Sequence, residues 1–231
     1  VIIVAPDVQQ SGVGRSLSLF APVIVSKSDL QTEVYSLSGT PADSVIIGIH
    51  GILKFNPDLI ISGINMGENL SSEATTSGTV GAALEGASQS VPSIAVSVHT
   101  GKEFRLDDAN NTIDFSLSKI ITNKLAKFIL KEGMPEGTDL FNVNVPASSS
   151  KHRIRLTRLA RRMYTTKVKK RLDPRGRSYF WIDGDPIYQA NEGTDVHAVR
   201  IENSISITPM QLDLTREKSM KNLMNLERLL D

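Results

Sequence analysis

Short apolar runs alternate with helical patterns over roughly the first 145 residues of the chain. The apolar runs that predict strands are residues 1–5, 33–37, 58–62, 93–98 and 140–145. Several are continuously apolar, which is typical of strands covered on both faces. Between them the pattern predicts helices over residues 40–53, from residue 77 or 78 onwards, and over residues 110–131. This alternation predicts an α/β fold, with a mostly parallel sheet between two layers of helices.

The pattern changes in the last third of the chain. "RIRLTR" alternates basic and apolar residues, as a half-exposed antiparallel strand does, and the segments that flank the turn signal "DPRG" predict a β-hairpin arm. "SISITP" predicts another strand, and residues 215–231 predict an amphipathic helix. We therefore divide the chain into a core, residues 1–147, and a second part of the same domain, residues 148–231, with the arm, the final strands and the C-terminal helix.

The first predicted strand raises an expectation about what precedes it. In open α/β folds the first strand is usually central and its following loop usually functional. This chain opens inside an apolar strand, "VIIVAPD", without an initiator Met. We expect a preceding strand and helix of roughly 30 residues, the size of one such unit, and any targeting leader would also lie there.

Composition and charge narrow the class of protein. The chain is 40% hydrophobic and 22% charged, it has no cysteine, and no apolar run approaches the roughly 18 residues of a membrane helix. Its net charge is +1, yet residues 151–177 hold 12 Lys and Arg against one acid. This basic segment is either a surface that faces an acidic partner subunit or a patch that attracts anionic substrates. Only Tyr164 offers a stacking ring there, which disfavours a dedicated nucleic-acid binder.

Polar residues gather just past three predicted strands, where ligands bind in open α/β sheets. They are Ser11, Gly12 and Gly14, then Gly39 and Thr40, then Asn65, Asn69, Ser77 and Thr79. Hydroxyl and amide oxygens suit Mg²⁺, Mn²⁺ or Ca²⁺, although neutral ligands alone bind these ions weakly and carboxylates would be needed as well. Glycines and a helix N-terminus suit a phosphate. Ordinary loop residues, with a helix cap at Thr40, are the simpler interpretation.

Other common sites are absent from the sequence. "SGVGRS" lacks the Gly-Lys-Ser/Thr of a phosphate-binding P-loop, "GINMGENL" is not a dinucleotide fingerprint, and there is no Gly-x-Ser-x-Gly elbow. The four histidines are scattered without the spacing of metal ligands. Nucleophilic serine chemistry and a histidine metal centre are therefore disfavoured.

Eight segments occur in a characteristic order: "VAPD" with its following "SG", "GTPADSV", "PDLIISGINMGENL", "SGTVGAALEG", "NVNVP", "DPRGRSYFWI", "GTDVHAV" and "SISITPMQLDLT". In this order they resemble the SurE survival proteins, a family of metal-dependent nucleotidases and acid phosphatases, over essentially the whole chain. The resemblance implies a Rossmann-like three-layer sandwich whose arm and C-terminal helix exchange between subunits in homodimers or homotetramers. It implies a cytoplasmic hydrolase of nucleoside 5′- and 3′-monophosphates, and of short polyphosphate in some members. Nucleic acid is not expected as the main partner, and no membrane association is expected.

The resemblance also assigns roles to residues. A divalent cation, Mg²⁺ or Mn²⁺ with Ca²⁺ as an alternative, is expected on Ser11 and Asn65 together with two Asp of an Asn-Asp-Asp-Gly loop. Asn69, Ser77 and Thr79 are expected to act on the phosphoryl group. The residues expected to bind the substrate are Gly12, Gly39, Thr40 and Gly78.

One departure from the family pattern keeps an alternative open. The Asn-Asp-Asp-Gly loop is absent, and the only Asp pair, Asp107 and Asp108, fits the start of a helix instead. We expect the acidic loop upstream of Val1. The alternative is a non-catalytic nucleotide-binding or assembly module on the same fold, and a nucleic-acid binder with a basic arm is a third interpretation.

Overall fold

The computed structural model describes residues 1–28, 33–100, 113–146, 153–216 and 219. Its elements run in the order β1 (Ile2–Pro6), β2 (Val25–Lys27), β3 (Glu33–Leu37), α1 (Pro41–Ile46), η1 (Ile47–Leu53), β4 (Ile60–Met66), η2 (Ser72–Thr76), α2 (Gly78–Ser88), β5 (Ser93–His99), α3 (Ser116–Glu132), β6 (Leu140–Pro146), β7 (Ile154–Leu156), β8 (Lys167–Leu172), β9 (Ser178–Asp183), η3 (His197–Ile201) and β10 (Ile205–Met210). The five strands predicted in the core are confirmed, as are the helices that begin at residues 41 and 78. The predicted C-terminal helix and the Asp107–Asp108 pair lie outside the described residues.

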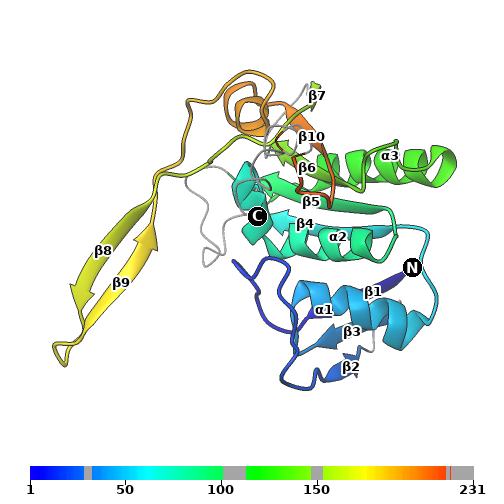
Figure 1. The fold of residues 1–231 in the computed structure, drawn as a ribbon, viewed down its shortest axis with the longest axis horizontal. Coiled ribbons are helices and arrows are strands. Elements are labelled where there is room, and N and C mark those ends of the chain that lie inside the picture. Colours follow the sequence, from blue (N-terminus) through cyan, green and yellow to red (C-terminus); the bar gives the residue numbers. More distant parts are fainter. Residues whose placement is uncertain (29–32, 101–112, 147–152, 217–218, 220–231) are drawn as a thin grey trace, which may run out of the picture.

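The main sheet has five strands in the order β4-β5-β6-β10-β7 (Figure 1). Strands β4, β5 and β6 are parallel, and β10 is antiparallel to β6. The expectation that residues 153–158 form an antiparallel strand was wrong, because β7 pairs in parallel with β10. An alternation of basic and apolar residues reports which faces are exposed and carries no information about strand direction.

The first strands form a sheet of their own. Strands β1 and β3 are parallel, β2 is antiparallel to β3, and no ladder in the described residues joins β1 to β4. Strands β1 and β4 thus each have one edge without a sheet partner in the described part of the chain. Ile3 on β1 and Ile61 on β4 are both 47% exposed, in contrast to the fully buried strands β5 and β6. The sequence predicted one sheet at this place, and the structure shows two.

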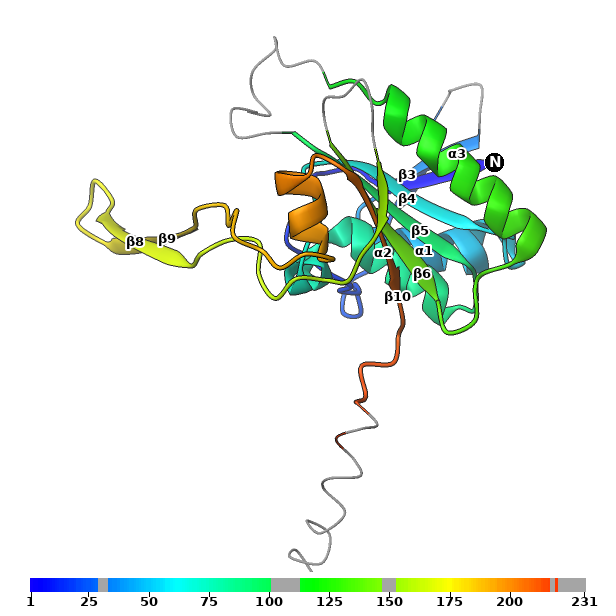
Figure 2. The same ribbon diagram turned by 90° about the horizontal axis from the view of Figure 1, so that it is seen from above.

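Helices cover both faces of the five-stranded sheet, as predicted. On one face α3 packs through Ile121 and Ile129 against β5, β6 and β10 (Figure 2). On the other face α2 packs through Val80 and Ala83 against Ala95 on β5 and its neighbours. Burial of each large aliphatic side chain contributes roughly 1.5–3 kcal/mol, so these two interfaces hold the strand ends in fixed positions.

Strands β8 and β9 form the predicted arm, which projects well away from the body of the molecule (Figures 1 and 2). The turn at its tip is closed by the Asp173 carboxylate, which accepts hydrogen bonds from the backbone N–H groups of Arg175 and Arg177. All residues of both strands are exposed, including Trp181. Within the described ranges, no helix is both long enough and apolar enough to cross a membrane.

Candidate functional site

The loop that carries Ser11 is packed tightly on the first turns of α2. Gly14 donates its backbone N–H to the Thr76 carbonyl at 2.8 Å, and a Cβ added at Gly81 would lie only 2.2 Å from the Gly14 carbonyl oxygen. The Arg15 guanidinium donates to the buried Glu85 carboxylate at 2.8 Å. Burial raises the pKa of Glu85, but the hydrogen bonds from Arg15, Gln89 and Ser88, together with the charge of Arg15, outweigh burial and lower that pKa. Sequence reasoning found Ser11 and Gly14 but missed Gly81, which makes this close approach possible.

The N-terminus of α1 joins the same cluster. Thr40 caps this helix by accepting from the Asp43 N–H at 3.1 Å, while the Asp43 carboxylate accepts from the backbone N–H groups of Thr40 and Ser18. Burial raises the pKa of Asp43, and the hydrogen bonds from Ser18 and Thr40 outweigh this and lower the pKa. The Thr40 hydroxyl donates its only proton to the Ser16 carbonyl at 2.7 Å. The simpler interpretation of Thr40 as a helix cap is therefore confirmed, and its hydroxyl has no proton for a ligand while this bond stands.

Gly78 lies where the three segments meet. A Cβ at Gly78 would lie 2.9 Å from Pro41 Cγ and 3.0 Å from the Gln10 carbonyl oxygen. Ser77 is the N-cap of α2 and accepts from the Val80 N–H at 3.3 Å. The N-terminus of α2, a helix of eleven residues, thus lies against a loop rich in glycine. The N–H groups and the dipole at a helix N-terminus favour an anion there.

Gly12 and Gly39 have different local roles in this cluster. Gly12 has φ +78°, a conformation that favours glycine, and a Cβ there would meet no atom within 4 Å. A Cβ at Gly39 would lie 2.6 Å from the Asp43 carboxylate, so Gly39 makes room for the α1 cap. Substrate binding by either glycine stays a prediction.

The predicted phosphate ligand Asn69 is held by a buried polar network. Its backbone N–H donates to Asn144 Oδ1 at 2.8 Å, and its carbonyl accepts from Asn142 Nδ2 at 2.8 Å and Asn144 Nδ2 at 3.2 Å. Its own amide nitrogen donates to Ser97 Oγ at 2.8 Å. Ser97, Asn142 and Asn144 are fully buried. Sequence reasoning missed these three, although two asparagines at alternate positions of an apolar strand place both amides on one face.

Asn65 lies at the end of β4, and its side chain turns back onto its own loop. Its amide nitrogen donates to the Gly67 carbonyl at 2.8 Å. The amide oxygen accepts none of the hydrogen bonds found among the described residues and is available to a cation. Ser11 is exposed, and its hydroxyl oxygen accepts from Gln9 Nε2 at 3.1 Å.

The structure sorts the predicted residues into two groups. Ser11, Gly12, Gly39, Thr40, Ser77, Gly78 and Thr79 belong to the cluster around the start of α2. Asn65 lies near the end of β4 and Asn69 lies in the loop that follows, and this loop reaches that cluster through η2. The side-chain hydrogen bonds found for Ser11 and Asn65 go to Gln9 and Gly67 and do not join the two residues. Ser11 follows β1 and Asn65 lies near the end of β4, and these two strands belong to different sheets. The described residues also hold no group of three or more His, Cys, Asp or Glu able to bind a metal. Ser11 and Asn65 therefore fit the oxygen chemistry of a hard divalent cation but supply no negative charge.

Glu68, between the two asparagines, carries a buried charge. One carboxylate oxygen accepts from Arg200 Nη2 at 2.6 Å, and the other lies 2.6 Å from His99 Nδ1. Burial alone raises the pKa of Glu68, but the hydrogen bonds and charges of His99 and Arg200 override it and lower the pKa to about 2. Sequence reasoning missed this group, because Arg200 lies 132 positions further along the chain.

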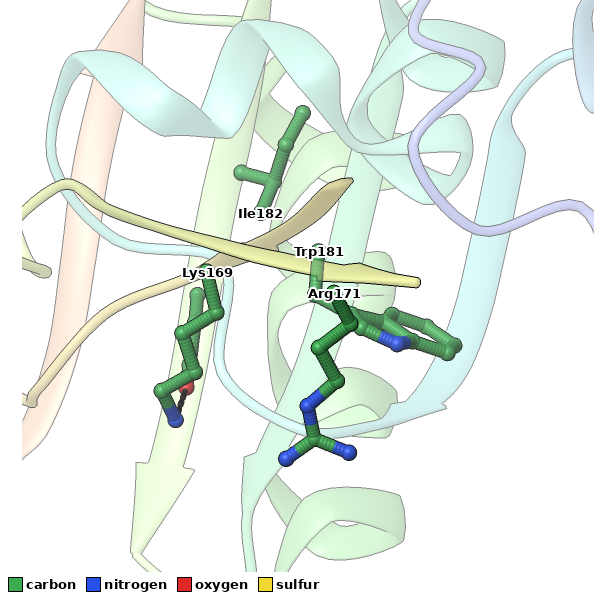
Figure 3. Close-up of a pocket in the computed structure, with 5 residues that line it drawn as sticks. Lys169, Arg171, Trp181 and Ile182 are labelled. Carbon is green, nitrogen blue, oxygen red and sulfur yellow. Dashed lines mark hydrogen bonds and ion pairs between the residues drawn. The ribbon is translucent and has the colours of Figure 1, made fainter. Parts of the chain in front are cut away.

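A second feature lies on the arm, away from this rim. An open hollow of about 300 Å³ is lined by Lys169, Arg171, Trp181, Ile182 and Asp183 (Figure 3). Lys169 is paired with Asp183 across the two strands. The hollow lies on the exposed surface of a two-stranded ribbon, and none of the predicted site residues lines it.

The fold is an open α/β fold, and the N-terminus of α2 lies at the rim that follows the parallel strand β4. A family model described as "Survival protein SurE" matches residues 1–166, and the chain belongs to this family. It is 52% identical over 219 residues to a 5′-nucleotidase SurE of Methanocella arvoryzae, which covers 93% of this chain and 82% of that protein. It is 51% identical over 217 residues to a 5′-nucleotidase SurE of Archaeoglobus fulgidus, with the same coverage. The crystal structure of a SurE protein from Aquifex aeolicus superposes with a TM-score of 0.78 at 39% identity, covering 98% of this chain and 88% of that one.

Proposed function

We propose that this protein is a hydrolase that releases phosphate from nucleoside monophosphates. Its relatives named 5′-nucleotidase SurE are about half identical to it over most of the chain, which supports a nucleotide phosphomonoesterase. The observation that carries the proposal is the meeting of the Ser11 loop, the start of α1 and the N-terminus of α2 at Gly78. This arrangement offers backbone N–H groups to a phosphate at the rim where open α/β folds bind ligands.

Three side chains are proposed to act on the phosphoryl group. Ser77 and Thr79 flank the first backbone N–H groups of α2, and both are partly buried. Asn69 uses one amide proton on Ser97 and keeps a second for a phosphate oxygen. Donors fixed in advance by surrounding hydrogen bonds stabilise the charge that develops on a transferring phosphoryl group without reorganising.

A divalent cation, Mg²⁺ or Mn²⁺, is part of the proposal. Ser11 and Asn65 would supply two neutral oxygens, and carboxylates other than those described would supply the charge. When bound, the cation offsets the charge of the phosphate and lowers the pKa of a water molecule on it. Activity on 3′-nucleotides and short polyphosphate belongs to the same proposal, as does a cytoplasmic location. So does a homodimer or homotetramer formed by exchange of the arm and the C-terminal helix.

The proposal is tested by substituting the two expected cation ligands. Ser11→Ala and Asn65→Ala should each lower the rate of phosphate release from nucleoside monophosphates at fixed Mn²⁺ by at least about tenfold, which is about 1.4 kcal/mol in the barrier. They should also raise the Mn²⁺ concentration needed for half-maximal rate. Ser26→Ala, on the exposed strand β2, is the matched control. Wild-type rates and metal requirement in both variants would remove these residues from the site.

A further inference from the structure

Arg200 on η3 contacts three parts of the molecule that are far apart in the sequence. Its Nε and Nη2 atoms donate to Glu68 Oε1 at 3.1 and 2.6 Å. Its Nη1 atom donates to the Met163 carbonyl at 2.5 Å and the Ile187 carbonyl at 3.1 Å. The guanidinium also lies 4.8 Å from the centroid of the Tyr164 ring. It also lies 6.0 Å from the centroid of the Tyr188 ring, and the side chain is 1% exposed.

Met163 precedes β8 and Ile187 follows β9, and the two segments around these residues form the base of the arm. The Ile187 N–H donates to the Met163 carbonyl at 2.8 Å, and Tyr164 forms a bridge with Pro186. Arg200 therefore donates hydrogen bonds to a backbone carbonyl in each of the two segments of the arm base. Beyond this base every residue of β8 and β9 is exposed, and the ribbon projects away from the body (Figures 1 and 2).

Glu68 connects the same guanidinium to the proposed site. It lies between Asn65 and Asn69 in the loop after β4, and its second oxygen is occupied by His99 at the end of β5. Both carboxylate oxygens are thus used, and the side chain is 7% exposed. A buried charge cannot give up its partner cheaply, because the partner left behind remains desolvated. A shift of the arm base that moves Arg200 must therefore also move Glu68 and the loop around it.

We propose that Arg200 is a positioning residue that couples the seating of the arm to the geometry of the Asn65–Asn69 loop. The inference rests on the proposed function, in which this loop binds the phosphate. The coupling is reciprocal, because two events that share one free energy affect each other equally. When the arm base keeps its hydrogen bonds to Arg200, the loop binds phosphate more tightly. Bound phosphate in turn stabilises those hydrogen bonds.

The test is made on the full-length protein with inorganic phosphate in the presence of Mg²⁺, so that it does not depend on turnover. Phosphate affinity is measured by calorimetry, and hydrogen exchange is measured on peptides that cover residues 163–165 and 185–187. In the wild type, saturating phosphate should slow exchange in both peptides. Arg200→Met should weaken phosphate binding by at least tenfold and abolish this protection. Arg155→Met is the matched control, because the ion pair found for Arg155 is with Glu202 and involves neither the loop nor the arm base.

A second variant guards against a simple loss of folding. Glu68→Gln keeps the shape of the side chain and removes its charge, and it should weaken phosphate binding in the same direction. The double variant should bind phosphate no more weakly than the weaker single variant, because the two residues act as one unit. Additive losses, wild-type affinity in folded Arg200→Met, or unchanged exchange at the arm base of the wild type would each overturn the inference. If the wild type shows coupled phosphate binding without phosphate release, the proposed function fails and the coupling stands.

Discussion

Gly81→Ala should separate the Ser11 loop from the helix on which it rests. The Cβ would lie 2.2 Å from the Gly14 carbonyl oxygen, 2.5 Å from its carbonyl carbon and 2.8 Å from the Arg15 nitrogen. All three atoms are backbone, so no side chain can rotate away to relieve the overlap. To reach an ordinary van der Waals separation of 3.4 Å, the loop must move by roughly 1.2 Å.

Two effects of opposite sign decide the size of the change. Alanine in place of glycine within a helix stabilises it by about 1 kcal/mol. Overpacking at a close-packed contact costs about 1–3 kcal/mol, and the Arg15–Glu85 ion pair spans the same contact. We expect a net loss of up to about 2 kcal/mol in the free energy of unfolding. The rate of phosphate release should also fall, even where the protein remains folded, because the displaced loop carries Ser11.

The assay is denaturant unfolding together with steady-state hydrolysis of a nucleoside monophosphate. Gly51→Ala is the matched control, because a Cβ there would meet only Ile47 Cγ2, at 3.4 Å. It should be neutral or stabilising by up to about 1 kcal/mol. If Gly81→Ala matches Gly51→Ala in both unfolding free energy and hydrolysis rate, the close packing of the Gly14 backbone against Gly81 is refuted.

Three further predictions concern the residues that hold the site. Asn144→Ala leaves the partly buried N–H of Asn69 without this acceptor and should cost about 1 kcal/mol of unfolding free energy, with a larger loss of phosphate affinity than of maximal rate. Ser77→Ala removes the cap that accepts from Val80 and should cost about 1 kcal/mol, whereas Ser77→Asp should restore the cap but repel phosphate. The folded pKa of Glu68, about 2, lies below the ordinary 4.5, so its stabilisation is present above pH 4.5 and lost as pH falls toward 2. Acid titration of unfolding should show a loss of about 3 kcal/mol over this range, and Glu68→Gln should flatten it.

The sequence pattern predicted the core strands, the start of α1 and the turn of the arm. These features depend on residues that are close together in the sequence. The predicted strands at residues 93–98 and 140–145 lie within β5 and β6, and every residue of these two runs is buried. Thr40 followed by Pro41 marked the start of α1, and the structure shows a complete capping box there. The turn signal "DPRG" likewise marked the tip of the arm, where one carboxylate closes the turn through backbone hydrogen bonds.

Contacts across long stretches of sequence could not be predicted in this way. The pairing of Glu68 with Arg200 depends on where η3 packs, and nothing in either local pattern indicates the other residue. Gly81 looked like an ordinary helical residue, since its role depends on the backbone of a loop that lies more than sixty positions earlier. The parallel pairing of β7 with β10 and the break between β1 and β4 are also decided by the tertiary arrangement. The division at residue 147 stays a prediction.

The central claim is metal-dependent hydrolysis of nucleotides at this rim, and one measurement tests it most directly. The full-length protein is incubated with nucleoside monophosphates and Mg²⁺ or Mn²⁺, with and without EDTA, and inorganic phosphate is measured. We predict release of phosphate that EDTA abolishes and that renewed Mg²⁺ or Mn²⁺ restores. Absence of phosphate release with either metal, from folded protein that binds the nucleotide, would contradict the account and favour a binding module on the same fold.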